Sequence, residues 1–324
     1  MRRLVGMSIM ALALALAPAA ALAQPSQTPD TAAPADDSDY EHRPAFSSAS
    51  GTTGIWFVPT GTVLSDRQWS VSLYRTNYDD GQGFSDISSF PVNFAYGLGG
   101  VAEIFGSFQT INRIDRDTRP LFFTSTPDGV EAGTGGGIVV NAPQMRSEWS
   151  GSKLGDLWVG GKVNLLPNAP AALAVRAAVK LPVGDDDAGV SSGATDFQID
   201  AIVSHFNPAV EVSGYGGLMM RGNPDGYELT NGLRWGVGAS FPQRYSAGFR
   251  VTTELFGEAY FNDTITAPAG LVGTDGSFVP VSTRIRNPAI AALGVTWQGS
   301  NGFFVGAGVT WNVSMSGRDS AAIE

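Results

Sequence analysis

The sequence predicts an all-β protein, an antiparallel transmembrane β-barrel of about twelve strands. Segments of about ten residues alternate apolar and polar side chains, which is typical of strands with one apolar face. The connections between these segments are alternately short and long. Charged residues make up 15% of the chain, against about 25% in ordinary soluble domains.

The N-terminal stretch places Arg2 and Arg3 before an apolar run that ends in Ala-Leu-Ala at 21–23. This is the layout of a secretory signal peptide, and cleavage is expected before Gln24. A retained membrane anchor is the alternative, because the run approaches the length of a spanning helix. Both interpretations predict export.

Four regions follow along the chain. After the signal peptide (1–23), residues 24–50 are rich in Pro, Ala, Ser and Asp and should form a disordered periplasmic lead. The barrel is expected over 51–315, with a C-terminal tail over 316–324. No long apolar stretch follows the signal peptide, which excludes a helical membrane protein.

The alternation is clearest in ALAVRAAVKLPVGDDD (172–187). A helix would place Arg176 and Lys180 on one face as readily as a strand would. The alternation of Leu173, Val175 and Val179 with the two cations decides for a strand. The same pattern predicts strands near 51–58, 68–77, 89–98, 100–110, 154–165, 170–182, 194–205, 208–220, 231–241, 244–257, 287–298 and 301–315.

Short connections should face the periplasm and long ones the cell exterior. The long connections are expected at 111–153, 183–193, 221–230 and 258–286. A barrel with an even number of strands and both termini in the periplasm needs an extracellular first connection, yet the one after 51–58 is short. Either 51–58 is not a barrel strand and another strand lies within 111–153, or one connection is misassigned.

A soluble barrel or sandwich with its apolar rows turned inward also fits the alternation. Two features favour the membrane. The strands have the length of membrane-crossing strands, and aromatic residues on the apolar rows flank short turns, as in an interfacial girdle. These are Phe241, Tyr245, Trp297 and Phe303.

Composition excludes several classes of protein. The chain has no cysteine, so disulfides and zinc–thiolate sites are impossible. The formal net charge is −10 and falls to −12 once Arg2 and Arg3 are removed, which argues against nucleic acid as a partner. No cofactor is expected.

Several segments resemble a known family of barrels. They are LWVGGKVNLL, AALAVRAAVKLPVGDDDAGVSSGATDF, VEVSGYGGLMMRGNPDG and NGLRWGVGASFP. They resemble outer-membrane transporters of the phenol-degradation (MetA pathway) type, and also the barrels that precede a peptidoglycan-binding domain in outer-membrane-protein-A-like chains. The resemblance implies a Gram-negative outer-membrane barrel that passes small solutes, and it implies no catalytic residues.

Charged residues on the polar rows are expected to line the lumen. A charged lining selects solutes by field and size, whereas a network of salt bridges would only satisfy charges across strands. Both interpretations stay open for these residues: Glu103, Asp156, Lys162, Arg176, Lys180, Asp196, Asp200, Glu211, Arg234, Arg250, Glu254 and Glu258.

Two loops carry further charge. The long connection at 111–153 holds a cluster of charged residues: Arg113, Asp115, Arg116, Asp117 and Arg119. The cluster would form a constriction if the loop folded into the lumen, although a solvated loop is the simpler interpretation. The acidic loop offers oxygen ligands for Ca²⁺ or Mg²⁺, but without the spacing of a known site, so no metal site is predicted; its carboxylates are Asp185, Asp186, Asp187 and Asp196.

The expected function is a passive channel or transporter for small solutes in the outer membrane of a Gram-negative bacterium. The alternative is a structural or surface-interaction barrel whose lumen is closed by salt bridges. An enzyme is not expected, because His42 lies in the lead and His205 in a short turn, so neither is placed as a catalytic base. The expected partners are outer-membrane lipid, lipopolysaccharide and the barrel-assembly machinery.

Overall fold

The computed structural model describes residues 8–14, 47–80, 85–115, 125–126, 129–130, 150–167, 171–186, 188, 190–206, 209–224, 226–242, 248–266, 282–284, 287–299 and 302–314. These residues form strands, turns and irregular segments, so the predicted all-β fold is confirmed. Within these ranges no helix is long and apolar enough to cross a membrane.

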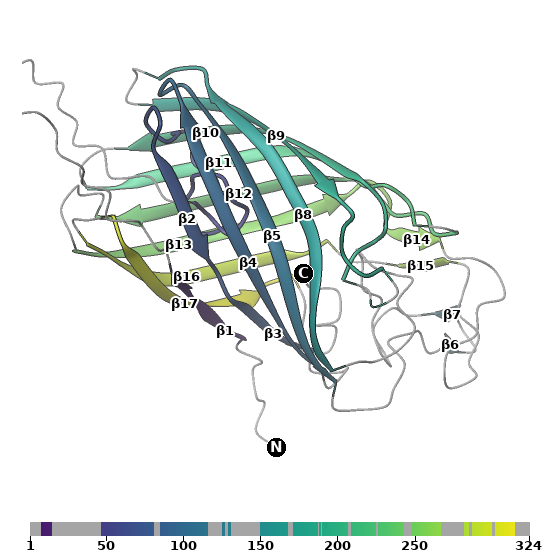
Figure 1. Cartoon of the computed structure of the whole chain (residues 1–324). Coiled ribbons are helices and arrows are strands. Elements are labelled where there is room, and N and C mark those ends of the chain that lie inside the picture. The colour runs from purple at the N-terminus through teal and green to yellow at the C-terminus, as the bar shows by residue number, and fades with distance from the viewer. Residues whose placement is uncertain are drawn as a thin grey trace, which may run out of the picture.

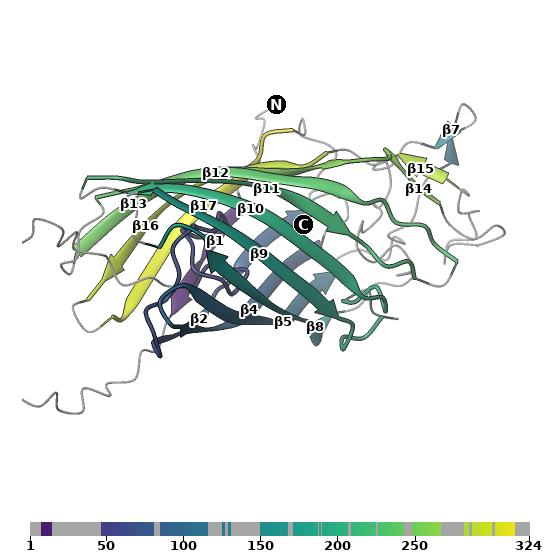
Figure 2. The same cartoon turned by 90° about the horizontal axis from the view of Figure 1, so that it is seen from above.

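One large antiparallel sheet contains most of the strands (Figures 1 and 2). Its order is β2-β1-β17-β16-β13-β12-β11-β10-β9-β8-β5-β4-β3. The sheet is strongly curved, and its long strands lie tilted side by side (Figure 1). The strands are β1 (Ser8–Leu14), β2 (Trp69–Leu73), β3 (Thr76–Asp80), β4 (Ser85–Leu98), β5 (Ala102–Asp115), β8 (Gly151–Asn164), β9 (Ala171–Leu181), β10 (Asp196–Phe206), β11 (Glu211–Met220), β12 (Gly232–Phe241), β13 (Gly248–Tyr260), β16 (Ala289–Gln298) and β17 (Phe304–Asn312).

Four short strands lie among the long connections, at one end of the sheet (Figure 1). The strands β6 (Ser125–Thr126) and β7 (Gly129–Val130) pair with each other, as do β14 (Thr264–Thr266) and β15 (Ser282–Arg284). The turns β4–β5, β8–β9, β10–β11, β12–β13 and β16–β17 are short, and the intervening connections are long. We call the two ends of the sheet the turn end and the loop end.

The strand predicted at 51–58 is wrong, because these residues belong to no strand of the sheet. The strand predicted at 68–77 corresponds to β2 and the start of β3, which pair with successive parts of β4. The connection from β3 to β4 therefore joins these strands at the loop end, as the predicted topology requires of the first connection. With β2 and β3 taken as one strand and β1 set aside, the described wall has eleven strands. This odd number differs from the predicted even one: β2 begins at the turn end, whereas β17 ends at the loop end.

The two edges of this wall are linked by β1. It pairs antiparallel with β17 from Ser8↔Thr310 to Leu14↔Val305, and with β2 through Leu14↔Leu73. These residues fall within the predicted signal peptide. The link between β2 and β17 therefore depends on a segment that the sequence predicts to be removed on export.

The apolar rows face outward and the polar rows face inward. In β10, Phe197 is 52% exposed, whereas its neighbours Asp196 and Gln198 are 5% and 8% exposed. A soluble barrel would show the reverse, because an exterior of this kind in water would be an extended apolar patch. The burial pattern supports a membrane barrel, whose strands alternate apolar-out and polar-in.

Aromatic side chains of the predicted girdle lie at the turn end. Phe241 and Trp297 are exposed, and the ring of Trp297 lies 6.2 Å from that of Phe303, centroid to centroid. Tyr245 lies outside the described residues. These positions are where an interfacial girdle would meet the membrane surface.

Candidate functional site

Residues 47–64, which we call the inner segment, run inside the curve of the sheet rather than in its wall (Figure 2). The bridges Ser47↔Thr53 and Gly54↔Pro59 fold the segment back on itself. Gly51 has a φ of +90°, a conformation that favours glycine, and allows the first of these turns. The lead predicted at 24–50 overlaps the inner segment at residues 47–50.

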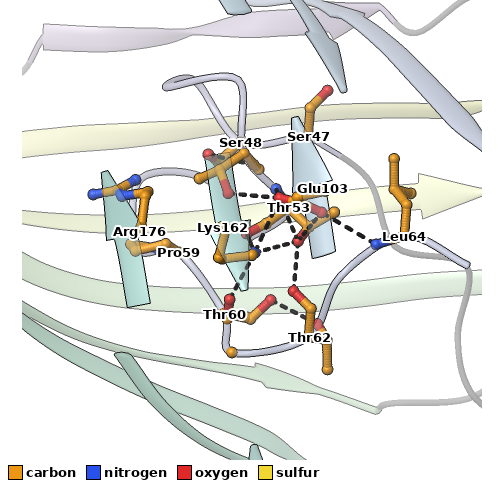
Figure 3. Close-up of polar contacts among 12 residues, drawn as sticks. Ser47, Ser48, Thr53, Pro59, Thr60, Thr62, Leu64, Glu103, Lys162 and Arg176 are labelled. Carbon is orange, nitrogen blue, oxygen red and sulfur yellow. Dashed lines mark hydrogen bonds and ion pairs between the residues drawn. The ribbon is translucent and has the colours of Figure 1, made fainter. Parts of the chain in front are cut away.

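Glu103 and Lys162 form the polar centre that holds one side of the inner segment (Figure 3). The Glu103 carboxylate accepts hydrogen bonds from the backbone N–H groups of Thr53 (2.8 Å) and Leu64 (3.1 Å). The Lys162 ammonium lies 3.2 Å from Glu103 Oε1 and donates to the carbonyl oxygens of Thr53 (3.0 Å) and Thr60 (2.8 Å). Both charged side chains are fully buried, and the backbone of the inner segment satisfies them.

Glu254 holds the tip of the inner segment from the other side of the lumen. Its Oε1 atom accepts the successive backbone N–H groups of Trp56 (3.1 Å), Phe57 (3.0 Å) and Val58 (2.8 Å). Successive N–H groups that converge on one oxygen form an anion-binding concavity. The Phe57 ring also stacks on inward-facing Phe256, with ring centroids 4.8 Å apart.

Trp56 lies in a socket of glycines on β16 and β17. A Cβ atom on Gly294 would lie 1.9 Å from the indole, and one on Gly308 would lie 2.5 Å from it. The indole Nε1 donates a 2.9 Å hydrogen bond to Thr296 Oγ1. Glycine on the inner face of these strands therefore makes room for a buried tryptophan.

Further contacts spread over the remaining wall. Ser204 accepts a 2.7 Å hydrogen bond from the N–H of Gly61, and Ser213 donates one of 2.7 Å to the Pro59 carbonyl. The segment also touches the wall on β2, β4, β5, β8, β9, β12, β13, β16 and β17. A segment in contact with opposite walls occupies the lumen at that level.

Other inward charges pair with one another across strands. Arg176 Nη2 lies 2.6 Å from Asp200 Oδ2, as expected from their register pairing. Lys180 lies between two carboxylates, 2.8 Å from Asp196 and 3.5 Å from Asp156. These contacts leave little free charge on this part of the wall.

Arg221, which no pattern in the sequence singles out, lies just beyond β11 at the loop end. Its guanidinium pairs with Glu258, Nη1 to Oε1 at 2.6 Å and Nη2 to Oε2 at 2.8 Å. Burial acts to lower the pKa of Arg221, but the hydrogen bonds and charge of Glu258 outweigh it, so the pKa is raised. The arginine therefore stays charged, and its ion pair with Glu258 lies at the loop end of the inward-facing residues.

Among the predicted lining residues, Arg234 differs from the paired cations. Within the described residues no carboxylate lies at ion-pair distance from its guanidinium, and its buried Nη1 atom has no hydrogen-bond partner. The guanidinium lies 5.7 Å from the ring centroid of Tyr215. Glu211 and Arg250 are buried on the inner face, whereas Arg234 is half-buried. Whether these side chains line a conducting pore stays a prediction.

A family model described as "Putative MetA-pathway of phenol degradation" matches residues 117–322, more than half of the chain. The chain belongs to this family. A search of curated proteins finds no match. The match covers β8 to β17 but not the inner segment.

Only two of the five residues predicted to form a constriction lie in the part of the chain that the structure describes. Arg113 and Asp115 belong to β5, where they pair with Ile87 and Ser85 of β4, so they are not loop residues as expected. Strand β5 extends five residues beyond its predicted end because β4 offers pairing partners along its full length. Arg116, Asp117 and Arg119 lie outside the described residues.

Two carboxylates of the acidic loop form ion pairs. Asp185 lies 2.6 Å from the Lys153 ammonium, and Asp196 pairs with Lys180. Asp187 lies outside the described residues. In the part of the chain that the structure describes, no three potential metal ligands are grouped, Asp186 included.

Of the two histidines, the structure describes only His205. His205 is not in a turn as expected but in β10, where it pairs with Ala171 and Val212 on the outward, exposed face. The strand continues through it because both neighbouring strands reach this level. His42 lies outside the described residues.

Proposed function

We propose that the protein is an outer-membrane transporter for small solutes whose lumen is closed at rest by the inner segment. The observation that carries this proposal is the occupied polar lumen, where a segment of the same chain is held by side chains of the wall. The contacts are mainly hydrogen bonds to Glu103, Lys162, Glu254 and serines. Such contacts can be exchanged for water, so the segment can shift without unfolding the wall.

The proposed location follows from the apolar exterior and the predicted export signal. The outward rows would contact outer-membrane lipid, and the loop end would face the cell exterior and lipopolysaccharide. The family supports an outer-membrane protein linked to phenol degradation. A transporter fits this better than an enzyme, because the inward charges Glu103, Lys162 and Glu254 hold the inner segment, and Arg176 and Lys180 pair with carboxylates of the wall.

Opening requires release of the tip from Glu254. A hydrogen bond to a charged group contributes about 1.5–3 kcal/mol, and three N–H groups share this carboxylate. Loss of the carboxylate should raise the open population at least about tenfold, since 1.4 kcal/mol corresponds to a factor of about ten. The alternative function, a permanently closed structural barrel, predicts no opening.

The test is single-channel conductance of the refolded protein in planar bilayers. Wild type should conduct rarely, and Glu254→Ala should conduct at least about tenfold more often. Glu228→Ala removes an exposed loop carboxylate and serves as the matched control, with wild-type behaviour expected. Folded Glu254→Ala that conducts no more than wild type would contradict the proposal in favour of the structural barrel.

A disulfide lock tests whether movement of the segment is needed. Ser47 Oγ lies 2.8 Å from Ser72 Oγ on β2, and the chain has no native cysteine. The substitutions Ser47→Cys and Ser72→Cys, added to Glu254→Ala, would link the N-terminal end of the inner segment to the wall. The C-terminal end of the segment is already held, because the chain continues from it into β2. Oxidation should suppress conductance and reduction should restore it, whereas either single cysteine should show no redox effect. Equal conductance in both redox states would show that this end need not move.

A further inference from the structure

Arg234 is an inward cation that forms no ion pair among the described residues. Four other lumen cations each lie within 3.2 Å of a carboxylate oxygen: Lys162, Arg176, Lys180 and Arg221. Arg234 has no such partner among the described residues, and its Nη1 atom is buried without a hydrogen bond. Keeping part of a charged group away from water without a hydrogen-bond partner costs free energy. A bound anion would therefore stabilise the charged Arg234 side chain.

The surplus carboxylate of the wall lies elsewhere. Asp156 and Asp196 both approach Lys180, while Asp200 Oδ2 is occupied by Arg176 Nε and Nη2 at 2.8 and 2.6 Å. Glu258, the register partner of Arg234, is itself paired with Arg221. Two carboxylates, Asp200 and Glu258, thus serve three arginines, Arg176, Arg221 and Arg234, and an added anion would balance the remaining positive charge.

The register places Arg234 between the loop end and the tip of the inner segment. Along β12 the inward positions run from Arg234 through Gly236 to Gly238, and they pair with Glu258, Phe256 and Glu254 of β13 respectively. Because β12 begins at the loop end, Arg234 precedes the level at which Glu254 holds the tip. A solute that enters from the loop end meets Arg234 before it meets the inner segment.

Aromatic rings lie one register row below Arg234. Tyr215 and Phe256 pair with Gly236 from opposite sides. A Cβ atom on Gly236 would lie 2.5 Å from Tyr215 Cε1 and 2.9 Å from Phe256 Cβ, so the glycine lets both side chains lie over β12. Phe256 in turn stacks on Phe57 of the inner segment.

From these neighbours we infer that the loop side of the lumen binds a small aromatic carboxylate of about the size of benzoate. The Arg234 guanidinium would pair with the carboxylate, for which its planar fork is suited. The aromatic ring of the ligand would pack against Tyr215 and Phe256. The inference rests on the proposed transport function only for access to the lumen.

Isothermal titration calorimetry of the full refolded protein in detergent tests this site, with benzoate, acetate and benzyl alcohol as probes. Benzoate should bind at least about tenfold more tightly than acetate, which lacks the ring, and than benzyl alcohol, which lacks the charge. Arg234→Gln should weaken benzoate binding at least about tenfold, and Arg234→Lys should weaken it less. Arg250→Gln changes a buried arginine near the turn end and should leave binding unchanged.

Three outcomes would overturn the inference, given variants that retain the circular dichroism of folded wild type. They are absence of benzoate binding, equal binding of acetate and benzoate, and benzoate binding that Arg234→Gln leaves unchanged. None of them alters the conductance expected of Glu254→Ala, so the proposed function would stand. Benzoate binding to a barrel that never conducts would instead keep the site and reject the transporter.

Discussion

The turn side and the loop side of the lumen use similar charged residues in different ways. On the turn side, Glu103 and Lys162 are fully buried and contact several polar atoms of the inner segment. On the loop side, Arg234 has no carboxylate partner among the described residues. One register row joins the two regions, from Glu103 through Lys162, Arg176, Asp200 and Gly217 to Arg234.

This difference shows that an inward charge is not by itself a pore-lining charge. Where backbone groups satisfy a charge, its removal should affect the fold and the position of the inner segment. Where a charge forms no ion pair with the wall, its removal should affect the binding of ligands more than the stability of the fold. Stability and binding measurements on matched variants therefore separate the two regions.

The largest effect on stability is expected on the turn side. Glu103→Leu would leave Lys162 buried without its counter-ion and would remove the acceptor of the Thr53 and Leu64 N–H groups. The free energy of unfolding should fall by about 3–5 kcal/mol, as measured by urea titration in detergent micelles. Lys153→Met breaks a partly exposed pair with Asp185 and should cost less than about 1 kcal/mol. Similar costs for both variants would remove the distinction between buried and exposed pairs.

The wall could be predicted from the sequence because its signal is local. Each membrane-crossing strand shows period-two alternation within about ten residues. The alternation predicted β9 and β10 within about two residues of their observed ends. It also predicted that Arg176 and Lys180 lie on the polar face, which the structure turns inward. It could not show which charges pair, because register brings together residues from different strands.

The inner segment could not be predicted in this way, because its contacts are distant in the sequence. Val58 and Glu254 are separated by 196 residues, and Trp56 and Thr296 by 240. The available signal was negative: 51–58 contains Gly51 and Gly54, alternates poorly and is followed directly by Pro59, features that argue against a wall strand. The glycines of the Trp56 socket look in the sequence like ordinary small residues of a polar row.

A smaller effect is expected in the Trp56 socket. Gly294→Ala would place a methyl group where the indole now lies, and overpacking of this kind costs about 1–3 kcal/mol. The urea midpoint should fall, and the conductance should rise as the inner segment shifts. Gly216→Ala is the matched control, since a Cβ atom there would meet nothing within 4 Å. If the two variants behave alike, Trp56 does not fix the position of the segment.

The smallest change in stability is expected on the loop side, at Arg234. Arg234→Met removes a half-buried charge that forms no ion pair among the described residues, so the free energy of unfolding should fall by less than about 1 kcal/mol or should rise. Arg176 lies on β9, three strands away from Arg234 in the sheet. Arg176→Met would leave Asp200 without its counter-ion, and the free energy of unfolding should fall by about 3–5 kcal/mol. Urea titration of both variants in the same micelles gives the comparison directly. A large loss at Arg234 would mean that the fold depends on this arginine, and its lack of an ion pair would then no longer distinguish the loop side as a place for ligands.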